Sequence, residues 1–199
     1  MSGDSVHTDR ILTVPNALSV ARLLLIPVFL WLVLAAQADI AAAIVLAVSG
    51  ATDWADGGIA RRTGQASRLG QVLDPLVDRL TIVATLLGLA LRALVPWWFV
   101  GLLVLREAVL LALLPMLRRH GLTALPVHYL GKAGTFALFW AFPLILAGSG
   151  DGTVSHVLSA LGWAFAIWGL GLYWYAAGLY LEQARRIARS GVVVGGTAP

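Results

Sequence analysis

Six long apolar runs, separated by short polar stretches, are the feature that most limits how this chain can fold. Each run is close to the roughly 20 residues that a helix needs to cross a bilayer. Inside the hydrocarbon, only helices and closed barrels satisfy all backbone hydrogen bonds. The alternating pattern of barrel strands is absent, so we predict six transmembrane helices. The runs cover residues 18–36, 40–60, 72–95, 97–117, 129–147 and 155–181.

Composition agrees with an all-α, polytopic membrane protein. Of 199 residues, 59% are hydrophobic and only 12% are charged, whereas a soluble domain carries about 25% charged residues. The absence of cysteine rules out disulfides and thiolate metal sites. The net charge of +4 is not gathered in one basic patch, so nucleic acid is not an expected partner.

Basic residues mark one side of the predicted bundle. They lie before the first run, around the two longer links and after the last run, whereas the opposite side has only Arg92. The positive-inside rule then places both termini and both longer links in the cytoplasm of a multi-pass protein of the cell membrane. The orienting residues are Arg10, Arg61, Arg62, Arg68, Arg118, Arg119, Lys132, Arg185, Arg186 and Arg189.

A single membrane domain accounts for nearly the whole chain. We expect it at residues 15–189, after an interfacial lead-in at 1–14 and before a disordered tail at 190–199 that is rich in glycine and valine. Ala36-Gln37-Ala38 resembles a signal-peptidase site, but Arg22 lies inside the apolar segment that precedes it. We therefore expect this segment to remain as the first span.

Four of the ten acidic residues fall within 26 positions. At about 100° per residue, Asp53, Asp56 and Gly57 share one face near the end of the second predicted helix. Asp74 and Asp78 stand four residues apart and form a stripe at the start of the third. A short link joins the two helices as a hairpin, so we expect the four carboxylates to converge at one depth.

Carboxylates gathered in this way repel one another and need positive charge between them. Oxygen ligands without His or Cys select hard cations such as Mg²⁺, Mn²⁺ or Ca²⁺. Four carboxylates suffice for two divalent ions, an arrangement suited to displacement at phosphorus. Gly57 and Gly70 leave room for a bulky ligand near the backbone. Arg61 and Arg68 lie where they can hold phosphate oxygens.

Other interpretations remain open at this point. A single aspartate near a helix end is commonly a cap or an interfacial charge, although two matched stripes are hard to explain in that way. Intramembrane carboxylates also mark divalent-cation transporters, but these have inverted repeats and none is visible here. A catalytically silent membrane scaffold is a third alternative. The glycines of the region Gly162–Gly178, including Gly169 and Gly171, are expected at close helix contacts.

The acidic segment resembles the signature of the CDP-alcohol phosphatidyltransferase family. That signature is Asp-x-x-Asp-Gly-x-x-Ala-Arg, about eight residues, then Gly-x-x-x-Asp-x-x-x-Asp, and residues 53–61 and 70–78 match it at every defined position. The resemblance implies a six-helix enzyme that transfers a phosphatidyl group from CDP-diacylglycerol to an alcohol. It also implies two divalent cations, Mg or Mn, as cofactors, membrane lipids as surroundings and a homodimer.

The resemblance also implies roles for single residues. Asp53, Asp56 and Asp74 would bind the metals. Asp78 would also bind a metal and would be the catalytic base that deprotonates the acceptor hydroxyl. The residues implied in CDP-diacylglycerol binding are Asn16, Ser19, Asp53, Gly57, Arg61, Ser67 and Gly70.

The resemblance implies an acceptor that is a lipid or a small phosphorylated alcohol. Residues 14–22 resemble the branch of the family that uses glycerol 3-phosphate or phosphatidylglycerol, which suggests Arg106, Arg118 and Lys132 as acceptor-binding residues. Enzymes that use glycerol 3-phosphate carry one arginine at the position of Arg106 and a second one eight residues later. This chain has Leu114 at the second position. We therefore expect phosphatidylglycerol as the acceptor, giving cardiolipin and CMP. Glycerol 3-phosphate is the alternative.

Overall fold

The part of the chain that the structure describes is all-helical, as predicted. The computed structural model describes residues 14–63, 68–119 and 129–190, and no strand occurs among them. The six helices are α1 (Val14–Leu34), α2 (Asp39–Thr63), α3 (Arg68–Leu91), α4 (Trp97–Arg119), α5 (Tyr129–Ala147) and α6 (Thr153–Ser190).

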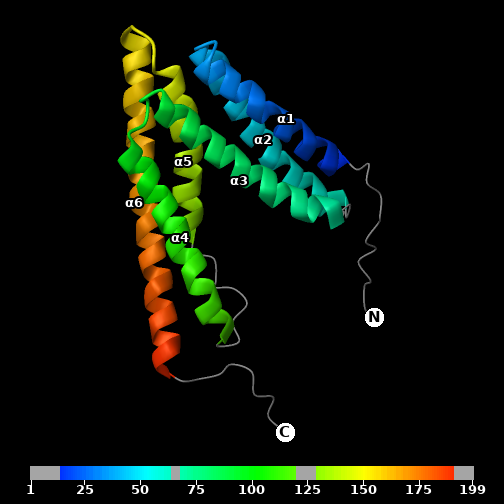
Figure 1. Ribbon diagram of the computed structural model, residues 1–199, viewed down its shortest axis with the longest axis vertical. Helices are drawn as coiled ribbons and strands as arrows, with labels where there is room; N and C mark the ends of the chain where they lie inside the picture. The colour runs from blue at the N-terminus through cyan, green and yellow to red at the C-terminus, as the bar shows by residue number, and fades with distance from the viewer. Residues whose placement is uncertain (1–13, 64–67, 120–128, 191–199) are drawn as a thin grey trace.

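Successive helices run in opposite directions, so the three short links gather at one end of the molecule (Figure 1). We call this end, with residues 35–38, 92–96 and 148–152, the short-link end. Helices α1, α2 and α3 form one group, and α4, α5 and α6 form a second (Figure 1). The two groups lie close together at the short-link end and diverge toward the opposite end.

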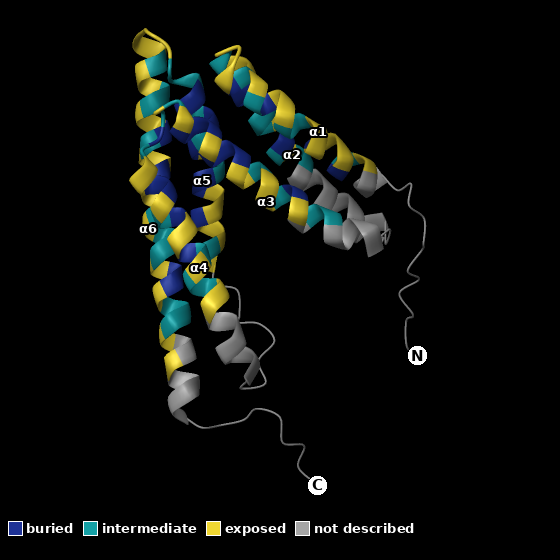
Figure 2. Cartoon of the chain, in the orientation of Figure 1, coloured by how far each residue is buried: buried dark blue, intermediate teal, exposed yellow. Residues whose placement is uncertain are grey.

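Over their described residues, three helices are long and apolar enough to cross a membrane. Their apolar stretches are Ala17–Leu34, Tyr129–Ala147 and Thr153–Glu182. In α2 the apolar stretch is shorter, Asp39–Thr52, because the acidic segment follows it. Large apolar side chains face outward along the bundle (Figure 2), among them Leu24 at 64% and Trp168 at 70% exposed. The six-span topology with cytoplasmic termini stays a prediction.

Several helices extend further than the apolar runs predicted. The last run ends at residue 181, but α6 continues to Ser190, because residues 182–189 are mostly good helix formers such as Glu, Gln, Ala and Arg. Likewise α2 continues to Thr63. Hydropathy reports which residues suit lipid, and it does not report where helical hydrogen bonding ends. The predicted lead-in at 1–14 and the predicted tail at 190–199 lie outside the described residues, except for Val14 and Ser190.

The packed core lies toward the short-link end. Its largest fully buried side chains include Val33 near the end of α1, Leu89 near the end of α3, Phe99 at the start of α4 and Leu146 near the end of α5. The ring of Phe99 meets the ring of Trp163 edge-on, with centroids 6.0 Å apart. Burial at this end holds the two helix groups together.

A polar cluster ties the same end across three helices. Asp39, in the first turn of α2, accepts hydrogen bonds from Arg92 just after α3 and from Ser149 just after α5. Sequence analysis found Arg92 to be the one basic residue on this side of the bundle. Its pairing with Asp39 explains why an isolated cation is tolerated there.

Glycine permits the close contact between α5 and α6. A Cβ added at Gly162 would lie 2.8 Å from the backbone nitrogen of Ile145, and one at Gly169 would lie 3.1 Å from the carbonyl oxygen of Gly134. The predicted packing role is therefore confirmed at these two positions. It is wrong for Gly171 and Gly178, where no atom of another helix in the described chain lies within 4 Å of an added Cβ.

We predict that Gly162→Ala lowers stability and that Gly171→Ala does not. Both changes gain the same helix propensity, about 0.5–1 kcal/mol. Only the first drives a methyl group into backbone that cannot move aside, at a cost of about 1–3 kcal/mol. Thermal unfolding of the two variants in the same detergent measures the difference. Equal unfolding temperatures would contradict the α5–α6 contact.

Candidate active site

The described part of the site joins α1 to α3. Ser19 and Arg22 stand three residues apart on α1, and Asp74 and Asp78 stand four residues apart on α3. Such spacings place each pair on one helix face, one turn apart. Because α1 contacts α3 along this stretch, the two pairs face each other.

Arg22 reaches both carboxylates. Its Nη1 atom donates to Oδ1 of Asp78 at 2.7 Å, and its Nη2 atom lies 3.6 Å from Oδ1 of Asp74. Ser19 donates its hydroxyl proton to the same oxygen of Asp74. Ser19 and Arg22 are buried, whereas the carboxylate side chains of Asp74 and Asp78 are 40% and 43% exposed. One side of the carboxylate pair is thus held by α1 and the other side is open.

The structure brings three of the predicted site residues together. Asp74 and Asp78 share a stripe on α3, and Ser19 of α1 lies beside Asp74. Residues 53–61 belong to α2, whose neighbour α1 also contacts α3. Whether the four carboxylates share an ion stays a prediction. The side chains of Asn16, Asp53, Asp56, Arg61 and Ser67, and Gly57 and Gly70 as ligand contacts, lie outside what the structure describes.

Arg22 is the residue that sequence analysis missed. It was noted as a cation inside an apolar run and as part of the opening segment, and it was given no role in the site. The sequence did contain a signal. A charged side chain in a membrane helix costs free energy unless it has a partner, so Arg22 could be expected to pair with an acidic residue. The partners, Asp74 and Asp78, lie more than fifty positions away in the sequence, so local spacing could not identify them.

The donor set suits a hard divalent cation. Asp74 and Asp78 offer oxygen ligands on a half-open surface, and the chain has no cysteine to compete with them. Among the described side chains, no group of three or more candidate ligands occurs. Asp53 and Asp56 would therefore have to complete the coordination, as the sequence predicts.

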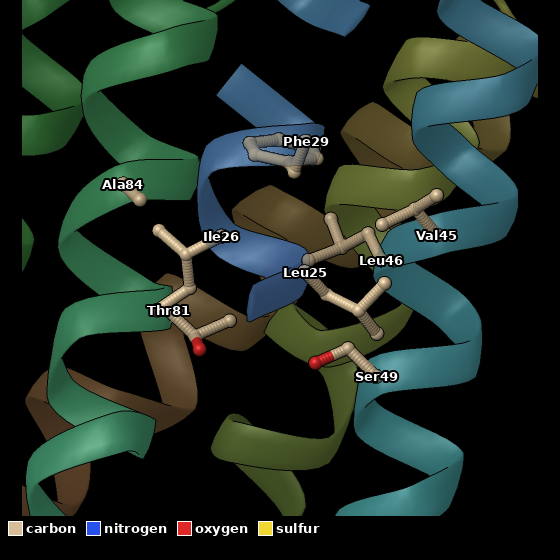
Figure 3. Close-up of a pocket in the computed structure, with 8 residues that line it drawn as sticks. All are labelled: Leu25, Ile26, Phe29, Val45, Leu46, Ser49, Thr81 and Ala84. Carbon is tan, nitrogen blue, oxygen red and sulfur yellow. The ribbon is translucent and has the colours of Figure 1, made fainter. Parts of the chain in front are cut away.

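An apolar pocket lies one helical turn from these charges (Figure 3). Leu25 and Ile26 follow Arg22 by one turn, Thr81 follows Asp78 by one turn, and Ser49 precedes Asp53 by one turn. The hydroxyl-bearing residues Ser49 and Thr81 lie at one edge of the pocket, and apolar side chains form the rest (Figure 3). The remaining lining residues are Phe29, Val45, Leu46 and Ala84. The space that these side chains enclose is about 10 Å³, which is no more than a single water molecule needs.

The suggested acceptor residues lie on the second helix group. Arg106 of α4 is 7% exposed and its Nη1 atom donates to Glu107 at 2.7 Å. Its guanidinium carbon lies 3.7 Å from the ring centroid of Tyr173 in α6. Lys132 is exposed at the start of α5, with its amine 5.8 Å from the ring of Tyr129. The side chain of Arg118 is not among those described.

We predict that Arg22→Met destabilises the protein more than Arg185→Met, which removes an exposed arginine of α6. The first change leaves two carboxylates without their buried counter-charge. We expect a loss of about 2 kcal/mol, below the 3–5 kcal/mol of a fully buried pair because both carboxylates are half exposed. Thermal unfolding in detergent gives the comparison. Equal effects of the two substitutions would show that the ion pairs contribute nothing to stability.

Comparison with known proteins identifies the family. The model for CDP-alcohol phosphatidyltransferase matches residues 12–168. The cardiolipin synthase (CMP-forming) of Streptomyces coelicolor is 50% identical over 192 residues, which cover 94% of this chain and 89% of the relative. A Mycobacterium tuberculosis protein provisionally named cardiolipin synthase is 51% identical over 181 residues, covering 91% and 87%.

A third relative bears a different name. The CDP-diacylglycerol–glycerol-3-phosphate 3-phosphatidyltransferase of Bacillus subtilis is 32% identical over 146 residues, which cover 66% of this chain and 75% of the relative. The family match spans the acidic segment and the first five helices, in agreement with the resemblance found in the sequence. The chain belongs to the CDP-alcohol phosphatidyltransferase family, and is a membrane-bound transferase of phospholipid biosynthesis.

Proposed function

We propose that the protein transfers the phosphatidyl group of CDP-diacylglycerol to phosphatidylglycerol, forming cardiolipin and releasing CMP. The observation that carries this acceptor is the 50% identity, over 94% of the chain, to a protein named for that reaction. Identity to the relative named for glycerol 3-phosphate is 32% over 66% of the chain. Leu114, which stands where the glycerol 3-phosphate enzymes carry an arginine, supports the same choice.

The reaction would proceed by direct displacement at phosphorus. A hydroxyl oxygen of the acceptor attacks the phosphatidyl phosphorus, the bond from that phosphorus to the CMP oxygen breaks, and CMP leaves with the bonding electrons. Asp78 would take the hydroxyl proton, and the partial exposure of its carboxylate supports this role. Ser19 and Arg22 hold Asp74 and Asp78 in position from α1.

Two divalent cations, Mg or Mn, bound by Asp53, Asp56, Asp74 and Asp78, would supply charge neutralisation for the diphosphate and for the departing CMP. The residues proposed to contact CDP-diacylglycerol are Asn16, Ser19, Asp53, Gly57, Arg61, Ser67 and Gly70. Of these, Arg61 would reach a phosphate.

We further propose six membrane spans with both termini and the active site on the cytoplasmic side of the cell membrane. The three short links at one end support this topology, because the basic residues of the sequence concentrate toward the other end (Figure 1). A homodimer rests on the family resemblance alone. Membership of a transferase family sets aside the transporter and scaffold alternatives.

An acceptor panel tests the proposed reaction. Labelled CDP-diacylglycerol is supplied in mixed micelles with either phosphatidylglycerol or glycerol 3-phosphate, and the lipid products are separated. We expect cardiolipin and CMP from the first acceptor and little product from the second. Phosphatidylglycerophosphate as the main product, without cardiolipin, would overturn the assigned acceptor and leave the family and the metal site unaffected.

We predict that Asp78→Asn lowers turnover by about 10²–10⁴-fold, the usual value of general-base catalysis. The amide oxygen can still accept from Arg22, so the fold should persist. Binding of Mn²⁺, measured directly, should persist through the other carboxylates. Asp151→Asn, an exposed change in a short link, is the control and should leave turnover unaltered. Full activity of the Asp78 variant would mean that another group accepts the proton.

A further inference from the structure

Arg22 is a counter-ion to two of the proposed metal ligands. Its Nη1 atom lies 2.7 Å from Oδ1 of Asp78, and its Nη2 atom lies 3.6 Å from Oδ1 of Asp74. Divalent cations at the proposed site would be attracted by the same two carboxylates. The guanidinium and the cations are therefore two sources of positive charge that act on one pair of anions, and they repel each other.

The contacts from α1 leave the carboxylates open to a cation. Arg22 contacts Oδ1 of both aspartates, and Ser19 donates its hydroxyl proton to Oδ1 of Asp74. The carboxylate side chains of Asp74 and Asp78 are still 40% and 43% exposed. A cation can thus approach from the open side while Arg22 stays in contact from the side of α1. The competition is electrostatic, and it does not require the arginine to leave.

The buried position of Arg22 makes this repulsion last. The Arg22 side chain is 3% exposed. One turn further along α1, the pocket beside Leu25 and Ile26 encloses about 10 Å³ (Figure 3). That space is about what one water molecule needs, so it is too small to take up a guanidinium group. We therefore expect Arg22 to remain beside the carboxylates when a cation binds to them.

The same positive charge is needed when no cation is bound. Asp74 and Asp78 stand four residues apart on α3, and like charges at this spacing destabilise a helix. Arg22 offsets this repulsion and joins α1 to α3 at the same time. Without it, the packing of these two helices would depend on bound metal, because only the metal would then balance the carboxylates.

A purely structural role for Arg22 has a different consequence. An arginine that only joined α1 to α3 would stabilise the metal-free and the metal-bound protein equally. A counter-ion that competes with the cations stabilises the metal-free protein more, since bound metal takes over part of its role. Because a ligand stabilises a protein according to its affinity, metal binding and thermal stability together distinguish the two roles.

We propose that Arg22 is a positioning residue that sets the affinity of the site for divalent cations. It stabilises the metal-free protein and weakens the binding of the cations by repulsion. The cations therefore stay exchangeable, and the carboxylates stay in place when the cations leave. This inference rests on the metal site of the proposed function, and it is independent of which alcohol is the acceptor.

Direct binding of Mn²⁺ to the full-length protein tests the inference. Free Mn²⁺ is measured by electron paramagnetic resonance in detergent, without either lipid substrate. Arg22→Met removes the charge and should lower the Kd for Mn²⁺ by about tenfold or more, equivalent to about 1.4 kcal/mol. Arg22→Lys keeps the charge and should restore a Kd close to that of the unmodified protein. Arg185→Met, which removes an exposed arginine of α6, is the control and should leave the Kd unaltered.

Thermal unfolding of the same proteins gives a second readout. Without metal, Arg22→Met should unfold at a lower temperature than the unmodified protein. Added Mn²⁺ should raise the unfolding temperature of this variant more than that of the unmodified protein, because the variant binds the ion more tightly. The difference between the two proteins should therefore shrink. A difference that Mn²⁺ leaves unaltered would indicate a purely structural role and overturn the inference.

The binding results separate this inference from the site on which it rests. Equal or weaker Mn²⁺ binding by Arg22→Met overturns the inference and leaves the metal site intact. Mn²⁺ binding by neither protein, or binding that Asp74→Asn does not weaken, overturns the metal site and the inference with it. If Arg22→Met does not fold, Arg22→Gln takes its place with the same expected results, since it keeps a donor for Asp78 without the charge. Failure of the proposed acceptor would be seen in the acceptor panel alone.

Discussion

The ion pairs between Arg22 and the carboxylates of Asp74 and Asp78 are the interaction on which the site depends. Carboxylates on an apolar helix need a counter-charge, because burying an unpaired charge costs free energy. Arg22 supplies it from the neighbouring helix and is itself buried. The contact of α1 with α3 and the placement of the two carboxylates therefore stabilise each other.

The two ends of the bundle have different physical roles. Near the short-link end, apolar side chains from α1, α3, α4 and α5 are fully buried, and Asp39 ties three helices together. Toward the other end the helix groups diverge, and the carboxylates of Asp74 and Asp78 stay half exposed (Figure 1). The closely packed core and the proposed site are thus separated along the helix axis.

Arg22 and Arg106 are both buried within apolar helices, and their charges are balanced in different ways. Arg22 balances two carboxylates and leaves them half open, which suits ligands that bring more positive charge. Arg106 is balanced by a single carboxylate and covered by an aromatic ring, which leaves a nearly neutral cluster. These differences follow from the partners of the two arginines, since the two cations are chemically the same.

Sequence alone determined the all-helical class, the number of helices, the stripe of Asp74 and Asp78, and the family, because each depends on local composition or on spacings within one or two helices. Only the tertiary structure decided which residues of other helices contact these residues. Arg22 and Asp78 are 56 positions apart, and Glu107 and Tyr173 are 66 apart. Helical periodicity reports which side chains share a face, but it carries no information about which face of another helix will meet them. That choice depends on how the apolar surfaces and glycine contacts of all the helices fit together, which no single segment encodes.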